Sequence, residues 1–91
     1  MKLPSTRKLL AFQLTARTGS FKRTAALLYI TPAAVSARVQ SLESELGIRL
    51  FRRGIRRLTL TDAGHVYAAE IEALFDRLRS ATRRLQLQGS R

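Results

Sequence analysis

The stretch 31–47, TPAAVSARVQSLESELG, carries its own signals for where a helix begins and ends. Its first residue, Thr31, is a good N-cap, because the hydroxyl can accept a hydrogen bond from a free backbone N–H of the first turn. Pro32 follows at the first helical position, where its missing N–H costs nothing. Gly47 can adopt the left-handed conformation that closes a helix. The stretch therefore predicts a helix over residues 32–46.

The predicted helix has two different faces. Spacings of four, three and four residues place its apolar side chains on one stripe, formed by Val35, Val39, Leu42 and Leu46. The opposite face has small, nearly uncharged side chains, namely Ala33, Ala37, Gln40 and Ser44, with Ser36 and Ser41 at its borders. A helix that only faces solvent more often carries Lys and Glu. Small side chains let a backbone approach a grooved surface closely, so we expect this face to lie in the major groove of DNA.

The composition limits what the chain can do. It has 91 residues, enough for one small domain, and a formal net charge of +11 from 17 basic and 6 acidic residues. Such an excess favours an anionic partner, with double-stranded DNA ahead of an acidic membrane surface. The chain has no cysteine, which excludes disulfides, thiolate metal sites and a cysteine nucleophile. We expect no metal and no cofactor.

Two shorter helices are predicted upstream. The first covers residues 5–18, and the second, capped by Ser20, covers residues 21–28. Lys22 and Arg23 lie in the first turn of the second helix, where positive charge opposes the helix dipole. Either an anion docks there, held by free amides, Ser20 and the two cations, or the chain tolerates a small surface penalty. This helix and the following one, with its small-residue face, are typical of a helix-turn-helix.

After Gly47 the periodicity changes from that of a helix to that of strands. On both sides of a turn at Gly54, apolar residues alternate with polar neighbours, at Ile48, Leu50, Leu58 and Leu60. This pattern predicts a two-stranded hairpin, the wing of a winged helix-turn-helix. The basic segment 49–57 contains no acidic residue. We therefore expect the wing to bind DNA phosphates or the minor groove through cations near its tip, with Arg52, Arg53, Arg56 and Arg57 as the candidates.

A long helix is predicted after the hairpin. Thr61 can cap it, Asp62 lies in its first turn, and no proline follows before about Gln88. A heptad seam runs along it, formed by Tyr67, Ile71, Leu74, Leu78, Ala81 and Leu85. Gly64 extends this seam and is expected to permit a close helix crossing. One alternative is that the helix folds back over the first three helices. At roughly 40 Å it is too long for that, so we expect a second copy of the chain to cover the seam in a homodimer.

The chain thus divides into a DNA-binding part, residues 1–60, and a linker and dimerisation helix, residues 61–91. The apolar run near the N-terminus is too short for a signal peptide, and no stretch suits a membrane span. We therefore expect a cytoplasmic protein with no membrane partner.

Three other functions compete with that of a sequence-specific DNA-binding module. An architectural protein that coats DNA without sequence preference is favoured by the high charge and stays open. A nuclease or other enzyme is disfavoured, because the only histidine, His65, has no clustered carboxylates or cysteine beside it. Membrane binding by a basic amphipathic helix is disfavoured by Glu70, Glu72 and Asp76 on the long helix.

An ordered set of short motifs resembles the LysR-type transcriptional regulators over essentially the whole chain. The matching segments are GSF at 19–21 with Arg23 and Ala25, AVS at 34–36, SLE at 41–43, LG at 46–47, LF at 50–51 with Arg53, and LTDAG at 60–64. Each motif alone is weak, but the set at matching spacings is highly specific. The tail ATRRL at 81–85 is similar to the branch that includes the glycine-cleavage activator.

The resemblance implies a mainly α fold, a winged helix-turn-helix of three helices and a two-stranded β wing followed by a long linker helix. It further implies that the linker helix makes a dimer, and that helix 32–46 reads an interrupted dyad in promoter DNA. A larger effector-sensing domain, absent from this chain, is expected in the full-length protein, where tetramers are possible.

Two positions depart from the family's pattern. Pro32 stands where a groove-facing glutamine is usual, and Ala37 stands where an arginine is usual. The resemblance therefore carries a base contact over at Ser36 and leaves Pro32 and Ala33 for apolar contact with thymine methyl groups. Arg38 lies toward the core flank, where phosphate contact is expected. The predicted DNA-facing set on this helix is completed by Thr31, Ala37 and Gln40.

Overall fold

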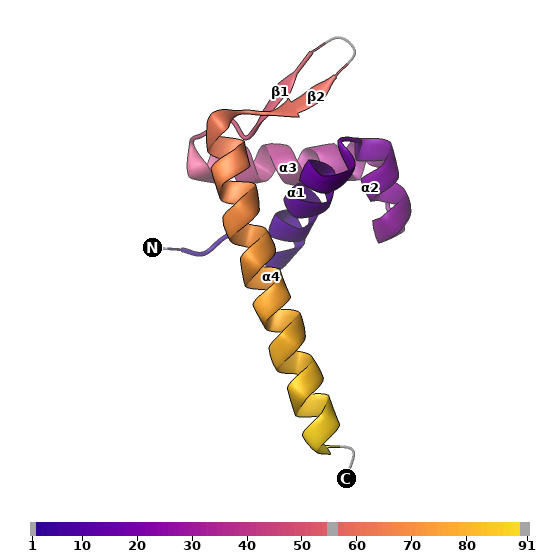
Figure 1. Cartoon of the computed structure of the whole chain (residues 1–91). Helices are drawn as coiled ribbons and strands as arrows, with labels where there is room; N and C mark the ends of the chain where they lie inside the picture. Colours follow the sequence, from indigo (N-terminus) through magenta and orange to yellow (C-terminus); the bar gives the residue numbers. More distant parts are fainter. Residues whose placement is uncertain (1, 55–56, 90–91) are drawn as a thin grey trace.

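The computed structural model describes residues 2–54 and 57–89. Three helices precede a hairpin and a longer helix, with the bounds α1 Thr6–Thr18, α2 Phe21–Leu28, α3 Pro32–Leu46, β1 Phe51–Arg53, β2 Leu58–Leu60 and α4 Asp62–Gly89 (Figure 1). The hairpin projects from the cluster of α1, α2 and α3, and α4 runs from the hairpin past this cluster (Figure 1). The predicted winged helix-turn-helix followed by a long helix is confirmed.

Side-chain caps explain why the first three helices begin where the sequence predicts. The hydroxyl oxygens of Ser5, Ser20 and Thr31 each accept a hydrogen bond from the backbone N–H three residues later, at 3.2, 3.0 and 3.1 Å. Each bond satisfies a donor that the helix itself leaves free. Gly19 and Gly47 end α1 and α3 with a φ of 68°, a conformation in which a side chain would be strained.

The core takes side chains from all four helices and from the start of the hairpin. Its buried apolar members are Ala11, Phe12, Ala25, Val35, Val39, Leu42, Leu50, Phe51, Ile71 and Phe75. The ring centroid of Phe12 lies 5.6 Å from the centroids of both Phe51 and Tyr67. Three members of the predicted α3 stripe, Val35, Val39 and Leu42, are fully buried. Each large apolar side chain removed from water stabilises the fold by about 1.5–3 kcal/mol.

The hairpin is shorter than its apolar pattern suggested. Its strands pair antiparallel in the register Phe51↔Leu60, Arg52↔Thr59 and Arg53↔Leu58. The predicted alternation fails ahead of the first strand, because Leu50 and Phe51 are both buried while Ile48 is half exposed. Strand pairing begins only at Phe51, so the pleat does not set the direction of the side chains before it.

The first half of α4 packs on the chain's own core. Ile71 and Phe75 are buried, and the ring of Tyr67 contacts that of Phe12. The prediction that a second copy covers the whole seam is therefore wrong for Ile71, which is core within one chain. Because α4 starts at the hairpin and lies against α1, its first apolar residues reach the core before any partner could cover them.

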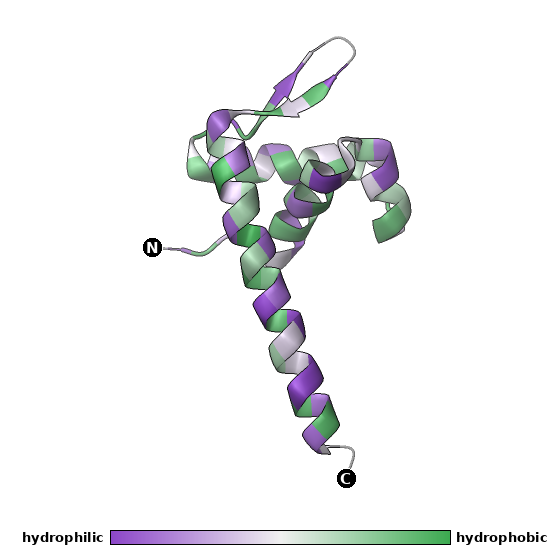
Figure 2. Cartoon of the chain, in the orientation of Figure 1, coloured by the Kyte–Doolittle hydropathy of each residue, from purple (hydrophilic) through white to green (hydrophobic). Residues whose placement is uncertain are grey.

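An exposed apolar stripe of α4 begins at Leu74 and continues along the second half of the helix, which extends beyond the cluster. Leu74, Leu78 and Leu85 are 54, 55 and 68 % exposed. Hydrophobic positions recur along the helix toward its end (Figure 2). This half of the predicted seam is uncovered in a single chain. Within the two described ranges, no helix is long and apolar enough to cross a membrane.

Gly64 lets α4 begin in contact with the backbone of Leu50. A Cβ on Gly64 would lie 2.1 Å from the Leu50 carbonyl oxygen, well inside any allowed contact. The same carbonyl oxygen accepts a hydrogen bond from the Thr61 N–H at 3.0 Å. The close helix crossing predicted at Gly64 is therefore wrong, because the close approach is to the residue that precedes β1 in the same chain.

Candidate nucleic-acid interface

The face of α3 that points away from the core is open to solvent, as the sequence predicts. Its exposed members are Thr31, Pro32, Ala33, Ala37, Gln40 and Ser44, and its half-buried borders are Ser36, Arg38 and Ser41. Gln40 is the only exposed side chain of this set that is long and polar. The face therefore has low relief, and it can approach a grooved surface at backbone distance.

Two cations lie at the N-terminus of α2. Lys22 and Arg23 are exposed, and among the described residues neither forms an ion pair. Ser20 is half-buried, and its Oγ accepts a hydrogen bond from the Arg23 N–H at 3.0 Å. The Ser20 oxygen is thus already used as the cap, and the two side chains with the positive helix end remain for an anion.

The wing arginines do not all have the same surroundings. Arg52 and Arg57 are exposed, and the Arg57 carbonyl closes the turn by accepting from the Gly54 N–H at 2.9 Å. Arg56 lies outside the described residues. Although segment 49–57 contains no acidic residue, Arg53 has an acidic neighbour in the fold, because Nη2 of Arg53 lies 3.6 Å from Oε1 of Glu43. Chain folding brings this carboxylate to the wing from a helix, which the local sequence of the wing cannot reveal.

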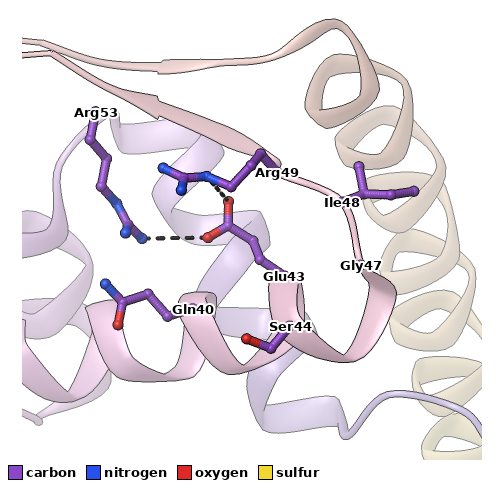
Figure 3. A pocket seen from close by; sticks show the side chains of 7 residues that line it. All are labelled: Gln40, Glu43, Ser44, Gly47, Ile48, Arg49 and Arg53. Carbon is purple, nitrogen blue, oxygen red and sulfur yellow. Dashed lines mark ion pairs between the residues drawn. The ribbon is translucent and has the colours of Figure 1, made fainter.

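A hollow of about 420 Å³ lies between α3 and the chain that leads into the wing. Its lining residues are Gln40, Glu43, Ser44, Gly47, Ile48, Arg49 and Arg53 (Figure 3). Figure 3 shows Arg49 and Arg53 directed toward the carboxylate of Glu43. Gln40 and Ser44 belong at once to this hollow and to the exposed face of α3. The hollow thus joins the helix face to the base of the wing.

Glu43 is a residue whose part in this site sequence reasoning missed. It follows Val39 by four residues and precedes Leu46 by three, so it falls on the apolar stripe of α3 rather than on its exposed face. A carboxylate at such a position is buried only with partners. That placement indicates a buried carboxylate with hydrogen-bond or ion-pair partners, although it does not identify the partners.

Tyr29 is a second missed feature. It ends α2 with a φ of 57°, a conformation that favours glycine or asparagine, and its side chain is 95 % exposed. It lies two residues before Thr31, at the turn between α2 and α3. The sequence predicts a short connection here, but nothing in its pattern indicates a fully exposed aromatic ring beside the predicted interface.

No metal-ligating chemistry accompanies these surfaces in the described part of the chain. Across residues 2–54 and 57–89, no three His, Cys, Asp or Glu side chains gather where they could hold an ion. Burial raises the pKa of the Tyr67 phenol, which belongs to α4 and not to the exposed face of α3. The cations and the small side chains of α3 thus make up the chemistry of the candidate interface.

A comparison with protein families matches residues 6–65 to the family described as bacterial regulatory helix-turn-helix protein, lysR family. A curated relative, the glycine cleavage system transcriptional activator of Escherichia coli, is 43 % identical over 90 residues. That alignment covers 99 % of this chain and 30 % of the relative, so this chain spans less than a third of the relative's length.

Solved structures resemble the whole arrangement, including α4. The crystal structure of the BenM_DBD/catB site 1 DNA complex has a TM-score of 0.79 at 33 % identity, over 90 % of this chain and 94 % of that one. Full-length CbnR complexed with its target DNA has a TM-score of 0.79 at 26 % identity, over 90 % of this chain and 28 % of that one.

Proposed function

The chain belongs to the LysR family of bacterial regulatory helix-turn-helix proteins, and on this premise we propose that it is the DNA-binding module of a sequence-specific transcriptional regulator in the cytoplasm. The observation that carries the proposal is the exposed small-residue face of α3, flanked by exposed cations at Lys22 and Arg23 of α2 and at Arg52 and Arg57 of the wing. A catalytic role has no support from the described side chains or from the relatives, which are regulators. The module acts by binding alone.

In this proposal α3, residues 32–46, lies in the major groove. Ser36, at the border of the exposed face, donates or accepts a hydrogen bond at a base edge. Pro32 and Ala33 contact thymine methyl groups, and Gln40 reaches a base or a sugar farther along the groove. Ala37 keeps the helix close to the groove floor because it adds little bulk. Arg38 and Thr31, on the flank and at the N-cap, face the phosphates.

The backbone contacts come from both sides of α3. Lys22 and Arg23 hold a phosphate at the N-terminus of α2, where the helix dipole and two cations favour an anion, and Ser20 contributes as the cap that fixes this helix end. On the other side, Arg52 and Arg57 are exposed and contact a second backbone segment or the minor groove, and Arg56 is given the same role on its place in the basic segment of the sequence. Arg53, at the last paired position of β1, contributes from a place fixed by Glu43. Contacts of this kind set register and orientation rather than sequence preference.

We further propose that the module works as a homodimer through the free half of α4. The side chains that a second copy covers are Leu74, Leu78, Ala81 and Leu85, of which the three leucines are more than half exposed in one chain. Tyr67 and Ile71 support α4 from within the domain instead. Two linked modules address the two halves of an interrupted dyad, and linkage raises their combined affinity without new contacts.

An architectural DNA-coating role is the second candidate. The observation that favours it is the scarcity of long hydrogen-bonding side chains on the α3 face, where Pro32 and Ala37 replace residues that could read bases. In that case charge alone would hold the protein on any duplex.

Competition binding separates the two candidates. A duplex that the chain selects from a random-sequence library should outcompete its scrambled version by about 10³ or more, the lower end for specific binders. Arg52→Ala should weaken binding to both duplexes equally. It should also reduce by about one the slope of log affinity against log salt concentration. Ser36→Ala should weaken binding to the selected duplex only, by about 1–3 kcal/mol. Equal affinity of the wild-type chain for both duplexes would contradict the proposed function in favour of the architectural role.

A further inference from the structure

Glu43 connects the exposed helix to the wing through the backbone. Its Oε2 accepts hydrogen bonds from the Leu50 N–H at 2.8 Å and from the Phe51 N–H at 3.1 Å. Its own carbonyl oxygen accepts from the Gly47 N–H at 2.8 Å and from the Ile48 N–H at 3.2 Å. One residue of α3 therefore holds both the turn that ends the helix and the first residue of β1.

The same carboxylate also holds two cations of the wing segment. Oε1 of Glu43 lies 3.6 Å from Nη2 of Arg53, and Oε2 lies 3.8 Å from Nε of Arg49. The guanidinium of Arg53 lies 5.5 Å from the ring centroid of Phe21 in α2. The side chain of Arg53 is 27 % exposed, compared with 66 % for Arg49. Arg53 is thus fixed between three elements rather than free in solvent.

This arrangement has an electrostatic cost for a protein that binds DNA. A carboxylate beside a phosphate-binding surface repels the strand and cancels one of the local positive charges. A wing that served only to attract DNA would bind better with a neutral residue at this position. The carboxylate supplies geometry instead, since a charged acceptor holds N–H and guanidinium donors more firmly than a neutral one.

We propose that Glu43 is a positioning residue for DNA recognition. It fixes the wing and Arg53 at a set distance from the exposed face of α3, so that the groove contact and the backbone contact are made together on the correct sequence. This inference rests on the proposed function. Its distinctive consequence is opposite in sign for the two kinds of DNA: removal of the charge weakens binding to the correct sequence while it favours binding to any other.

Two substitutions on the same helix make a matched pair. Glu43→Gln and Glu45→Gln each remove one negative charge from α3, but Glu45 is exposed and pairs with Lys8 of α1 instead of the wing. Each variant of the 91-residue chain is titrated with a duplex that the wild-type chain selects from a random-sequence library and with its scrambled version. The measured quantity is the Kd for the scrambled duplex divided by the Kd for the selected duplex, both at one salt concentration.

Glu43→Gln should lower this ratio about tenfold, the size expected for groups that share one hydrogen-bond network. The loss should arise at the selected duplex, while the scrambled duplex binds equally or more tightly. Glu45→Gln should leave the ratio within about twofold, as for an exposed ion pair. In an Arg53→Ala background the effect of Glu43→Gln should shrink, because the group that Glu43 positions is gone.

Glu43→Asp is the second variant and carries the test where Glu43→Gln does not fold. It keeps the charge but withdraws the carboxylate by one methylene, so it should also lower the ratio, with no change in charge. An unchanged ratio for either folded variant, or an undiminished Glu43→Gln effect in the Arg53→Ala background, would overturn the inference. A wild-type chain that selects no sequence is a separate result, since it contradicts the proposed function itself.

Discussion

The two halves of α4 carry one heptad pattern but have different surroundings. In the first half, Ile71 and Phe75 are 6 and 7 % exposed against the core of the same chain. In the second half, Leu78 and Leu85 are 55 and 68 % exposed. Ile71 and Leu78 are both members of the predicted seam and lie one heptad apart, so only the elements that the fold places beside them differ. Periodicity therefore identifies an apolar face without identifying what covers it.

The change from one surrounding to the other occurs between neighbouring residues. Leu74 is 54 % exposed, whereas Phe75 is buried. Phe75, four residues after Ile71, packs into the core of the domain, whereas Leu74, three residues after Ile71, faces solvent. One residue corresponds to a rotation of about 100° around the helix axis. The helix thus has two adjacent stripes, so a partner can cover one stripe while the domain keeps the other.

The largest expected effect tests whether the exposed stripe holds a second copy. Leu78→Glu places a charge at the middle of that stripe, where a partner helix would have to bury it. We expect a monomer with a folded winged domain and a loss of about 10²–10⁴ in affinity for a duplex with both half-sites, the usual gain from linked binding. Sedimentation and circular dichroism check the assembly and the fold.

Ser80→Glu is the control for this variant. It adds the same charge at an exposed position on the opposite side of the helix, so it should leave the assembly unchanged. A Leu78→Glu chain that still sediments as a dimer at micromolar concentration would mean that this stripe is not the contact between copies.

The second prediction compares equal truncations in the two halves. Ile71→Ala should lower the free energy of unfolding by about 2–5 kcal/mol, because it empties a filled site in the core. Leu78→Ala should change the free energy of unfolding of the monomer by about 0.5 kcal/mol or less, as at other surface positions. Urea unfolding of both variants, each at a concentration at which the chain is a monomer, gives the two values. Similar losses would erase the distinction between the halves.

The smallest expected effect concerns Tyr67, at the packed end of the comparison. Burial raises the pKa of this phenol above its ordinary value of 10.0, because the charged form is poorly solvated in the fold. The stability that this shift reflects is fully present below pH 10 and is lost as the pH rises through the folded pKa, since the unfolded chain releases the proton first. Tyr67→Phe should remove that alkaline loss.

Urea unfolding at about pH 9 and 11, on either side of the ordinary phenol pKa, measures the difference between wild type and Tyr67→Phe. Tyr29→Phe is the control, because it removes a phenol that is 95 % exposed in the folded chain. The idea fails where the wild-type chain and Tyr67→Phe lose the same stability over this interval.

The sequence was sufficient for features that depend on neighbours along the chain. Thr31, Pro32 and Gly47 bound α3 because capping acts within one helical turn, and the α3 face follows from its spacing. The ion pair of Arg53 with Glu43 lies beyond such reasoning, since it joins residues that only the fold brings together. The contact of Gly64 with Leu50 is similar: a glycine announces a close approach, but the approaching group comes from another element.

The peptide units around Leu50 connect three parts of the fold, namely α3, the start of the hairpin and α4. The Leu50 N–H donates a hydrogen bond to Glu43 of α3, and its carbonyl oxygen accepts one from the Thr61 N–H ahead of α4. Gly64 of α4 packs against the same carbonyl oxygen. Rotation of α4 about its first turn must therefore displace Leu50 and strain the bond to α3. The orientation of the long helix is thus coupled, through the backbone of Leu50, to the end of α3 that carries Glu43.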